Sequence, residues 1–219
     1  MGEIELVPDR KLFIIHSVLF FYGDAANDLL SKQIAEDIQQ HWNEASGKVV
    51  INNIAFNVEF DIEGIWSRSL SPQMVHENYG PRNNYFRLEE FASGNISFVD
   101  AINSNTGYFK LDNLLNNSTT AAHEYGHTIG LVHPEELDIR GKGTPGIMFP
   151  RGSIVDPPFQ YNPQAIAGDN TNGGTMNPFT RKVTQADIDN LRLNKINFNN
   201  SRFAKLGDFS SVWHEKHLQ

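Results

Sequence analysis

Residues 123–134, His-Glu-Tyr-Gly-His-Thr-Ile-Gly-Leu-Val-His-Pro, carry the side chains best suited to chemistry. His123 and His127 are four positions apart, so on an α-helix both imidazoles lie on one face, one turn apart. Each can then reach a single zinc ion at about 2.0–2.1 Å. Gly130 tolerates the backbone of a helix-ending turn, which would swing the chain back and deliver His133 as a third ligand. The spacing therefore predicts a zinc site with three histidine ligands.

Glu124 follows the first of these histidines and projects beside the metal, not onto it. Three protein ligands leave one coordination position open for water or substrate, which separates a catalytic zinc site from a closed structural one. Zinc lowers the pKa of water to roughly 7, and a neighbouring carboxylate can accept the proton. The pattern predicts hydrolysis with Glu124 as the general base. Two histidines at this spacing can arise by chance, but five specified identities over eleven positions make chance a weak alternative.

This stretch resembles the signature of the metzincin zinc endopeptidases. In that family a methionine-containing turn lies under the zinc. Met148, within Gly-Ile-Met-Phe-Pro, resembles the methionine of the matrixin form of this turn, and Met176 is the second candidate. Residues 184–191 resemble the start of the helix that ends matrixin-like catalytic domains. The resemblance covers residues 116–150 and 183–196 well, and earlier residues only through the order of elements.

The sequence also departs from the family pattern. The gap from His133 to Met148 is longer than in matrixins, and Pro134 after the third histidine is more like the serralysins. Pro150 stands where serralysins and astacins carry a tyrosine that can reach zinc, so no tyrosine ligand is expected. The glycine-rich calcium repeats of serralysins and the second zinc and calcium segment of animal matrixins are absent. The resemblance thus implies a divergent, bacterial, matrixin-like metzincin with one catalytic zinc ion, structural calcium being left open.

The resemblance implies an α+β, zincin-like fold. Its expected parts are a twisted, mainly parallel mixed sheet and two long helices, one of which bears the zinc ligands. A smaller irregular part with the methionine turn and a terminal helix would follow. A chain of 219 residues is one domain or two closely joined subdomains. We expect a single catalytic domain, residues 1–219, whose subdomains span residues 1–133 and 134–219.

Local patterns predict the elements that position the site. Residues 11–22 form the most apolar run, and their aromatic and β-branched content predicts a buried central strand, not a signal-peptide core. Apolar residues at helical spacing predict a long amphipathic helix over residues 25–45. Residues 116–122 offer N-cap residues and then helix formers ahead of the zinc ligands. Other patterns predict strands at 48–51 and 54–60, loop at 67–94, a strand pair at 95–111, and irregular chain at 149–183.

The resemblance also implies how substrate is bound. In metzincins an edge strand just before the zinc helix holds a protein or peptide substrate antiparallel, by β-augmentation. Residues 96–100 are the favoured candidate for this strand and residues 107–111 the alternative. The irregular segment after the zinc ligands would form a wall of the specificity pocket. Four aromatic residues either line this wall or pack in the core: Phe149, Phe159, Tyr161 and Phe179.

Composition limits the classes of function. The formal net charge of −8 argues against binding to nucleic acid or to anionic membranes. The chain has no cysteine, which excludes disulfides and a cysteine switch within it, and sets it apart from the cysteine-rich archaeal relatives of the family. The closing His214-Glu-Lys-His217 has zinc-like spacing but reads as a frayed polar end. By family resemblance we expect a secreted monomer, with no cofactor besides the metal.

Two other readings remain open at this stage. One is a catalytically silent, zinc-containing binding module that recognises a partner through the same cleft. The intact Glu124 argues against it, because a binding module needs no general base. The other is a secreted or injected, toxin-like protease of narrow specificity, or an exopeptidase. A cleft closed at one end would favour the exopeptidase over internal cleavage.

Overall fold

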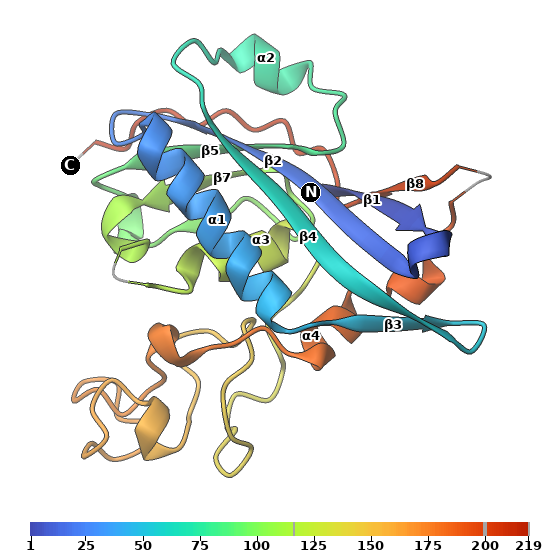
Figure 1. Cartoon of the computed structure of the whole chain (residues 1–219). Helices are drawn as coiled ribbons and strands as arrows, with labels where there is room; N and C mark the ends of the chain where they lie inside the picture. Colours follow the sequence, from blue (N-terminus) through green and yellow to red (C-terminus); the bar gives the residue numbers. More distant parts are fainter. Residues whose placement is uncertain (116, 199–200, 219) are drawn as a thin grey trace.

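A single mixed β-sheet organises the molecule (Figure 1). The computed structural model describes residues 1–115, 117–198 and 201–218; residue 116, the first of the predicted N-cap residues, lies outside this part. The strands are β1 (Gly2–Val7), β2 (Leu12–Tyr22), β3 (Lys48–Ile51), β4 (Ile54–Trp66), β5 (Asn83–Glu89), β6 (Phe98–Val99), β7 (Thr106–Lys110) and β8 (Phe203–Leu206). They lie in the order β3-β4-β2-β5-β7-β6, while β1 joins β2 to β8.

The centre of the sheet is parallel and its edges are antiparallel. β2 pairs in parallel with β4 from Leu12 to Phe21 and with β5 from Val18 to Tyr22, and β5 pairs in parallel with β7. β3, β6 and β1 add antiparallel pairs. A parallel strand covered on both faces is apolar along its whole length, which explains the apolar run of β2. The predicted mainly parallel, mixed α+β sheet is confirmed.

Helix α1 (Asp28–Glu44) packs across one face of this sheet. The side chain of Asn27 caps its first turn by accepting a hydrogen bond from the Leu30 N–H at 2.9 Å. The buried stripe of the helix faces β4, where Gly64 permits a close approach: a Cβ there would lie 2.1 Å from the Ser31 carbonyl oxygen. The predicted amphipathic helix over residues 25–45 is confirmed, with its start three residues later.

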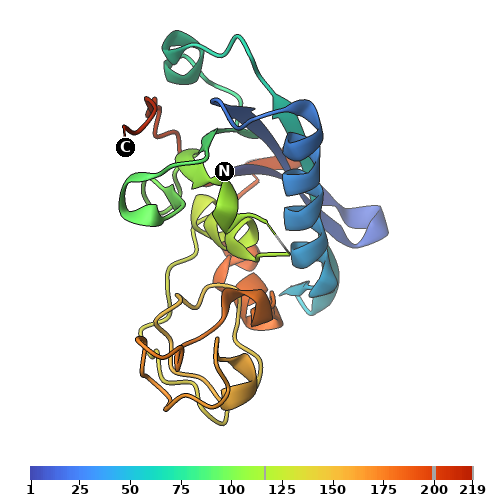
Figure 2. The ribbon, with the colours of Figure 1, turned by 90° about the vertical axis from the view of Figure 1, so that its left-hand side faces the viewer.

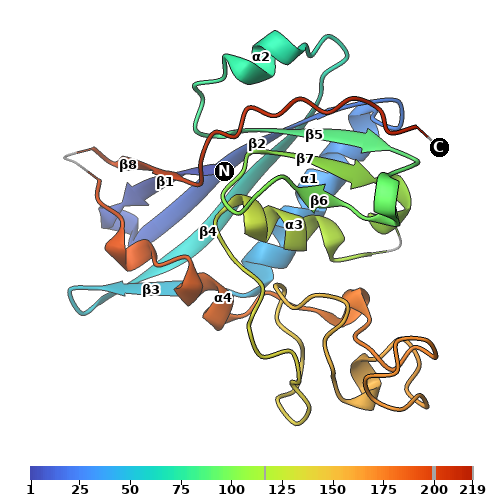
Figure 3. The ribbon, with the colours of Figure 1, turned by 180° about the vertical axis from the view of Figure 1, so that it is seen from behind.

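Side chains of the central strands alternate between two covered faces. Phe21 joins the main core beneath α1, whereas Tyr22 points the other way and packs with Val75 and Tyr85. This second face is covered by α2 (Pro72–His76) and by the C-terminal tail, which we define as residues 207–218. Figure 2 views the molecule from the side, with α1 on the right and the C-terminus on the left, and Figure 3 views it from behind.

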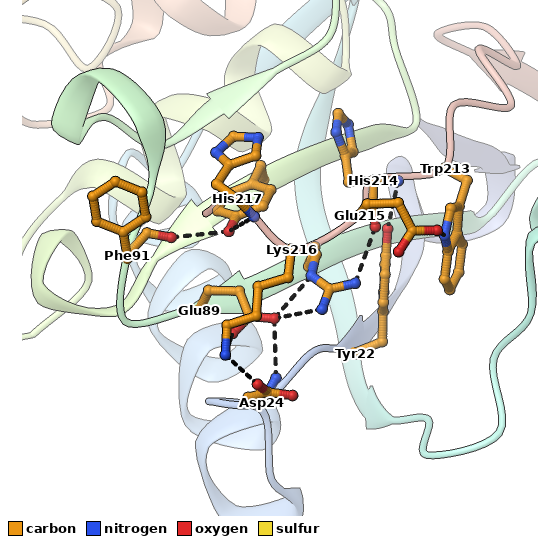
Figure 4. Close-up of polar contacts among 11 residues, drawn as sticks. Tyr22, Asp24, Glu89, Phe91, Trp213, His214, Glu215, Lys216 and His217 are labelled. Atoms are coloured by element: carbon orange, nitrogen blue, oxygen red, sulfur yellow. Dashed lines mark hydrogen bonds and ion pairs between the residues drawn. The ribbon is translucent and has the colours of Figure 1, made fainter. Parts of the chain in front are cut away.

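The C-terminal tail is docked onto the sheet by an aromatic stack and backbone hydrogen bonds (Figure 4). The ring of Trp213 stacks on that of Tyr22, with 4.5 Å between their centroids. The N–H of His214 donates to the Tyr22 hydroxyl at 3.2 Å, and Arg87 donates to the His214 carbonyl oxygen at 3.1 Å. A segment of polar composition is thus fixed to β2 and β5 at the centre of the sheet.

The two histidines of the tail contact side chains of the sheet and of the loops beside it. The His217 ring stacks on Tyr108 at 4.1 Å, and its Nδ1 accepts a hydrogen bond from the Ser93 N–H at 3.0 Å. His214 Nε2 lies 2.8 Å from an Asp100 carboxylate oxygen, out of line for a hydrogen bond. The expectation of a frayed polar end is therefore wrong, because ring stacking and hydrogen bonds hold these residues in place.

Replacing Trp213 with alanine tests how much the docked tail stabilises the fold. Trp213 is only half-buried, so we expect the free energy of unfolding to fall by about 1–2 kcal/mol. Urea unfolding followed by far-ultraviolet circular dichroism measures this change. Val212→Ala is the matched control at the exposed neighbouring position and should stay within about 0.5 kcal/mol of wild type. Identical midpoints for Trp213→Ala and wild type would mean that the tail is held elsewhere.

The remaining helices are shorter than predicted. The helix that carries the predicted ligands, α3 (Thr120–Thr128), has nine residues, because a turn at Gly130 ends it early. α4 (Gln185–Asn190) starts with the predicted capping box of Thr184 and Asp187 but has six residues. The chain then turns at Arg192, whose φ is +52°, and continues into β8 and the tail. Of the two predicted long helices, α1 is therefore confirmed, whereas the helix that carries the ligands is short. The predicted C-terminal helix starts where expected but has six residues and does not end the chain.

Residues 134–183 are as irregular as the sequence predicted and contain only two short 3₁₀ helices, Pro157–Phe159 and Pro178–Thr180. The segment has a small core of its own, in which Ile139, Val155 and Met176 are buried. The expected loop at residues 67–94 is wrong in part, since it contains both α2 and β5. Within the described residues, no helix is both long and apolar enough to cross a bilayer.

Candidate metal centre

Helix α3 is fixed in the core along most of its surface. The Tyr125 hydroxyl lies within hydrogen-bond distance of the Ser17 hydroxyl, at 2.8 Å, which ties the helix to β2. From α1, the indole N–H of Trp42 donates to the Ala122 carbonyl oxygen at 3.1 Å. The N-cap is Thr119, within the predicted lead-in. The helix therefore presents its two histidines from a rigid support, on one face as predicted.

Gly130 ends the helix in the turn that the sequence predicted. Its φ is +103°, which side chains other than hydrogen rarely allow. The Leu131 N–H donates to the Gly126 carbonyl oxygen at 2.9 Å, and the Gly130 N–H donates to that of His127 at 3.0 Å. This pair of bonds is a Schellman motif. It reverses the chain immediately and brings His133 back against the helix.

The three predicted ligands converge. The Nε2 atom of His133 lies 3.1 Å from Nε2 of His123 and 3.1 Å from Nε2 of His127. Within the described part of the chain, this is the one group of three or more potential metal ligands, with all ligand atoms within 4.8 Å of one another. Nitrogen ligands at 2.0–2.1 Å from a tetrahedral zinc stand roughly 3.3 Å apart. The donor set and its spacing therefore fit a zinc ion.

Hydrogen bonds to backbone carbonyls orient two of these rings. The Nδ1 atom of His123 lies 2.7 Å from the Ile147 carbonyl oxygen, and that of His127 lies 2.8 Å from the Leu131 carbonyl oxygen. A carbonyl only accepts, so Nδ1 carries the proton and Nε2 keeps its lone pair for a metal. Burial lowers the pKa of His123 well below its usual value and also lowers the pKa of His127 and His133. All three rings are therefore neutral at pH 7.

Met148 lies directly beneath α3. It is buried in the main core, and a Cβ added at Gly126 would lie 2.3 Å from its sulfur. Gly126 thus lets the thioether contact the helix backbone between the two histidines. The alternative methionine, Met176, is buried in the separate cluster with Ile139 and Val155. Of the two predicted candidates, Met148 is the one that packs against the helix carrying His123 and His127.

Glu124 is a buried carboxyl beside the three imidazoles, with 8% of its surface exposed. Burial raises its pKa to about 8, opposed by the positive charge of Arg181, by the Val99 N–H, which donates to it, and by Arg151. A divalent cation at the histidines would add positive charge and oppose the rise further. The contact with Val99 also means that the open side of edge strand β6 faces this carboxyl.

A pocket of about 180 Å³ opens beside Glu124. Its lining includes Ile96 and Ser97 before β6, His123 and Glu124 on α3, and two arginines, Arg151 and Arg181. Sequence reasoning missed both arginines. They lie thirty positions apart in or beside an irregular segment without periodicity, so no local signal could have found them.

The aromatic residues expected as candidates for this wall lie elsewhere. None of the four is part of the pocket lining. Phe149 and Phe159 pack against the small core of the irregular segment, as the alternative reading proposed. Tyr161 and Phe179 are exposed, with 46% and 47% of their surfaces accessible. The wall therefore contains two arginines, Arg151 and Arg181, and none of the four aromatic residues.

Comparisons with known proteins leave the family of this chain open. No protein-family model matches it, and no curated protein matches it. One solved structure, archaemetzincin from Methanopyrus kandleri, covers 86% of this chain and 98% of its own, with 15% sequence identity and a TM-score of 0.41. That similarity is too low to support a matrixin-like or any other assignment. The case for the site therefore rests on its own geometry.

Proposed function

We propose that this chain is a zinc-dependent endopeptidase of the metzincin type, in a divergent matrixin-like form. One observation carries the proposal: three neutral imidazoles converge on a single point beside a buried carboxyl. Three histidines leave one zinc coordination position open, which is the arrangement of a catalytic site. The ligands we assign are His123, His127 and His133, with one zinc ion and no other cofactor.

The chemistry divides between the metal and Glu124. When bound, zinc supplies a Lewis acid that activates water near neutral pH and polarises the scissile carbonyl. Glu124 takes the proton from the attacking water and returns it to the leaving amine. Its burial excludes bulk water, so the proton stays on the carboxyl between these two transfers. Met148 supports the rings from below as the methionine of the family's turn and takes no part in the chemistry.

Substrate binding is assigned to the edge of the sheet. β6 ends the strand order, and β7 lies inside it between β5 and β6, so of the two candidate segments residues 96–100 hold the edge. The open side of β6 faces Glu124, as the Val99 contact indicates. An extended peptide added antiparallel to β6 would pass its scissile bond over the three histidines. This placement supports internal cleavage. That the enzyme is secreted and monomeric is part of the proposal and rests on the family resemblance alone.

The alternatives make different demands on the same site. A catalytically silent zinc-binding module has no use for a buried carboxyl beside the ligands, because burying an ionisable group costs stability. A toxin-like protease of narrow specificity would use the same machinery on one substrate. The retained Glu124 therefore favours an enzyme, and substrate range separates the two enzymatic readings.

The proposal is tested by incubating the zinc-loaded protein with a diverse peptide mixture and mapping the cuts by mass spectrometry. Internal cuts that a chelator abolishes and added zinc restores are the expected result. Cuts confined to chain ends would replace the endopeptidase reading with an exopeptidase. Absence of any cut, with zinc bound at one ion per chain, would contradict a general peptidase and favour the binding module or a single dedicated substrate.

A further inference from the structure

Arg181 is a buried cation on the wall of the site. Only 4% of its surface is exposed. Its Nε donates to the Thr119 hydroxyl at 2.9 Å and its Nη1 donates to the Phe149 carbonyl oxygen at 3.0 Å. A guanidinium has five N–H donors, so these two bonds anchor the group and leave three donors without a partner in the described part of the chain. Arg181 also lines the pocket. Burial lowers its pKa to about 10, so it remains charged at neutral pH.

This buried charge lacks the partner that such groups ordinarily have. Buried arginines are almost always paired with a carboxylate. The same chain follows that rule elsewhere, since the shielded Arg87 lies 2.7 Å from the buried carboxylate of Glu89. No carboxylate in the described residues lies within ion-pair distance of Arg181. The carboxyl that acts on it electrostatically is Glu124, at longer range.

The pocket itself has room for one more group. Its volume of about 180 Å³ is below the roughly 300–1,000 Å³ of sites for drug-sized ligands, which suits a single side chain or chain end. Arg151 lines the same pocket from an exposed position. Glu124 is the one carboxylate in its lining. Two arginines thus face a space in which the sole acid is already assigned to catalysis.

The position of the pocket relates it to one half of the substrate. Glu124 donates its proton to the leaving amine, so the substrate fragment that leaves must lie next to the Glu124 carboxyl. The pocket contains Glu124 and therefore receives the residue whose amine leaves. A carboxylate in that residue would be the partner that Arg181 lacks, bound through the donors that its two anchoring bonds leave free.

We propose that this pocket, through Arg181 and Arg151, selects substrates with a carboxylate on the residue directly after the scissile bond. The proposal rests on the proposed peptidase function. The carboxylate can come from an Asp or Glu side chain or from the free C-terminus of a substrate that ends at this residue. A guanidinium fork recognises either by paired hydrogen bonds, so only measurement separates the two sources.

Matched peptides test the preference in the zinc-loaded protein. Around one mapped cut site, the residue after the cut is Glu, Gln or Leu in otherwise identical peptides with amidated ends. Two shorter peptides end at that residue with Leu as the free acid or as the amide. We expect kcat/KM at least about tenfold higher for Glu than for Gln if side chains are read. A tenfold advantage of the free acid over the amide would identify the C-terminus instead.

Variants locate the preference in the two arginines. Arg151 is exposed, so Arg151→Glu should fold normally. Its kcat/KM should be higher for the Gln peptide than for the Glu peptide, the reverse of wild type. Arg181→Gln should abolish the preference, and Arg181→Lys should restore part of it if the loss is one of charge. Arg140→Gln is the matched control, because Arg140 is an exposed arginine of the same segment, paired with Asp138 and outside the pocket. Arg140→Gln should keep the wild-type ratio of kcat/KM between the Glu and Gln peptides.

A binding measurement separates this proposal from the peptidase proposal. Product-like peptides that begin with Glu or Gln are titrated into wild-type protein by calorimetry, where no turnover occurs. We expect the dissociation constant to be several-fold lower for Glu and equal for both in Arg181→Gln. Equal kcat/KM for Glu and Gln, or for acid and amide, together with equal binding would overturn the carboxylate pocket. If no peptide is cut, the peptidase proposal fails and the binding ratio alone decides for or against the pocket.

Discussion

Replacing Glu124 with alanine is expected to leave a folded, zinc-binding protein whose peptidase activity falls by about three to four orders of magnitude. The carboxyl contributes no ligand to the three-histidine group, so zinc content should stay at one ion per chain. What is lost is the group that accepts a proton from water and returns it to the leaving amine. The measurement is kcat/KM on one mapped peptide, alongside zinc content and a thermal melt.

A matched control comes from the exposed carboxylates that follow the third ligand. Glu135 is exposed and lies outside the pocket, so Glu135→Ala should retain wild-type kcat/KM and zinc. If Glu124→Ala kept most of its activity while Glu135→Ala behaved as wild type, Glu124 would not be the base. Loss of zinc in Glu124→Ala would instead mean that this carboxyl supports the metal and not the proton transfer.

The convergence of the three histidines was predictable because it is a short-range property. His123, His127, Gly130 and His133 lie within eleven consecutive residues, and the geometry of one helix and one turn fixes their relation. The long elements were predictable for the same reason, since the apolar run of β2 and the helical spacing of apolar residues in α1 are patterns of consecutive residues. The catalytic and metal-binding roles of these side chains remain predictions.

Features that depend on residues far apart along the chain could not be predicted from the sequence. β8 has four residues and exists as a strand because β1, some two hundred positions earlier, supplies its hydrogen bonds. β5 has seven residues inside a stretch whose overall composition resembles a loop, and two parallel neighbours stabilise it. The tail looked frayed because its residues are polar, yet the stack of Trp213 on Tyr22 fixes it. Arg181 could not be predicted as a site residue, because only the folded chain places it in the same pocket as Glu124.

Replacing His127 with alanine is the second change with a large expected effect, and it acts on the metal. His127 supplies one of three nitrogens that lie within 4.8 Å of one another, and two ligands do not retain zinc against dilution. We expect less than about a tenth of an ion per chain after dialysis against a weak chelator. Peptidase activity should fall below detection together with the metal.

Thermal stability reports the same loss without any substrate. Zinc that binds the folded chain alone stabilises it by about 4 kcal/mol at a concentration of 1,000 Kd, which for a chain of this size raises Tm by about 8–16 °C. His127→Ala should lose this zinc-dependent rise. Its metal-free Tm should also fall by about 2–4 °C, because the Leu131 carbonyl oxygen loses its hydrogen bond from the imidazole.

His76→Ala is the matched control for both measurements. His76 is an exposed histidine on α2, outside the three-histidine group, so its loss should change neither zinc content nor the zinc-dependent rise in Tm. If His127→Ala kept one zinc ion per chain, the ligand assignment would be wrong whatever the activity. If both variants lost the same fraction of metal, the stabilising zinc would be bound at the surface, and the catalytic reading of the three histidines would fail with it.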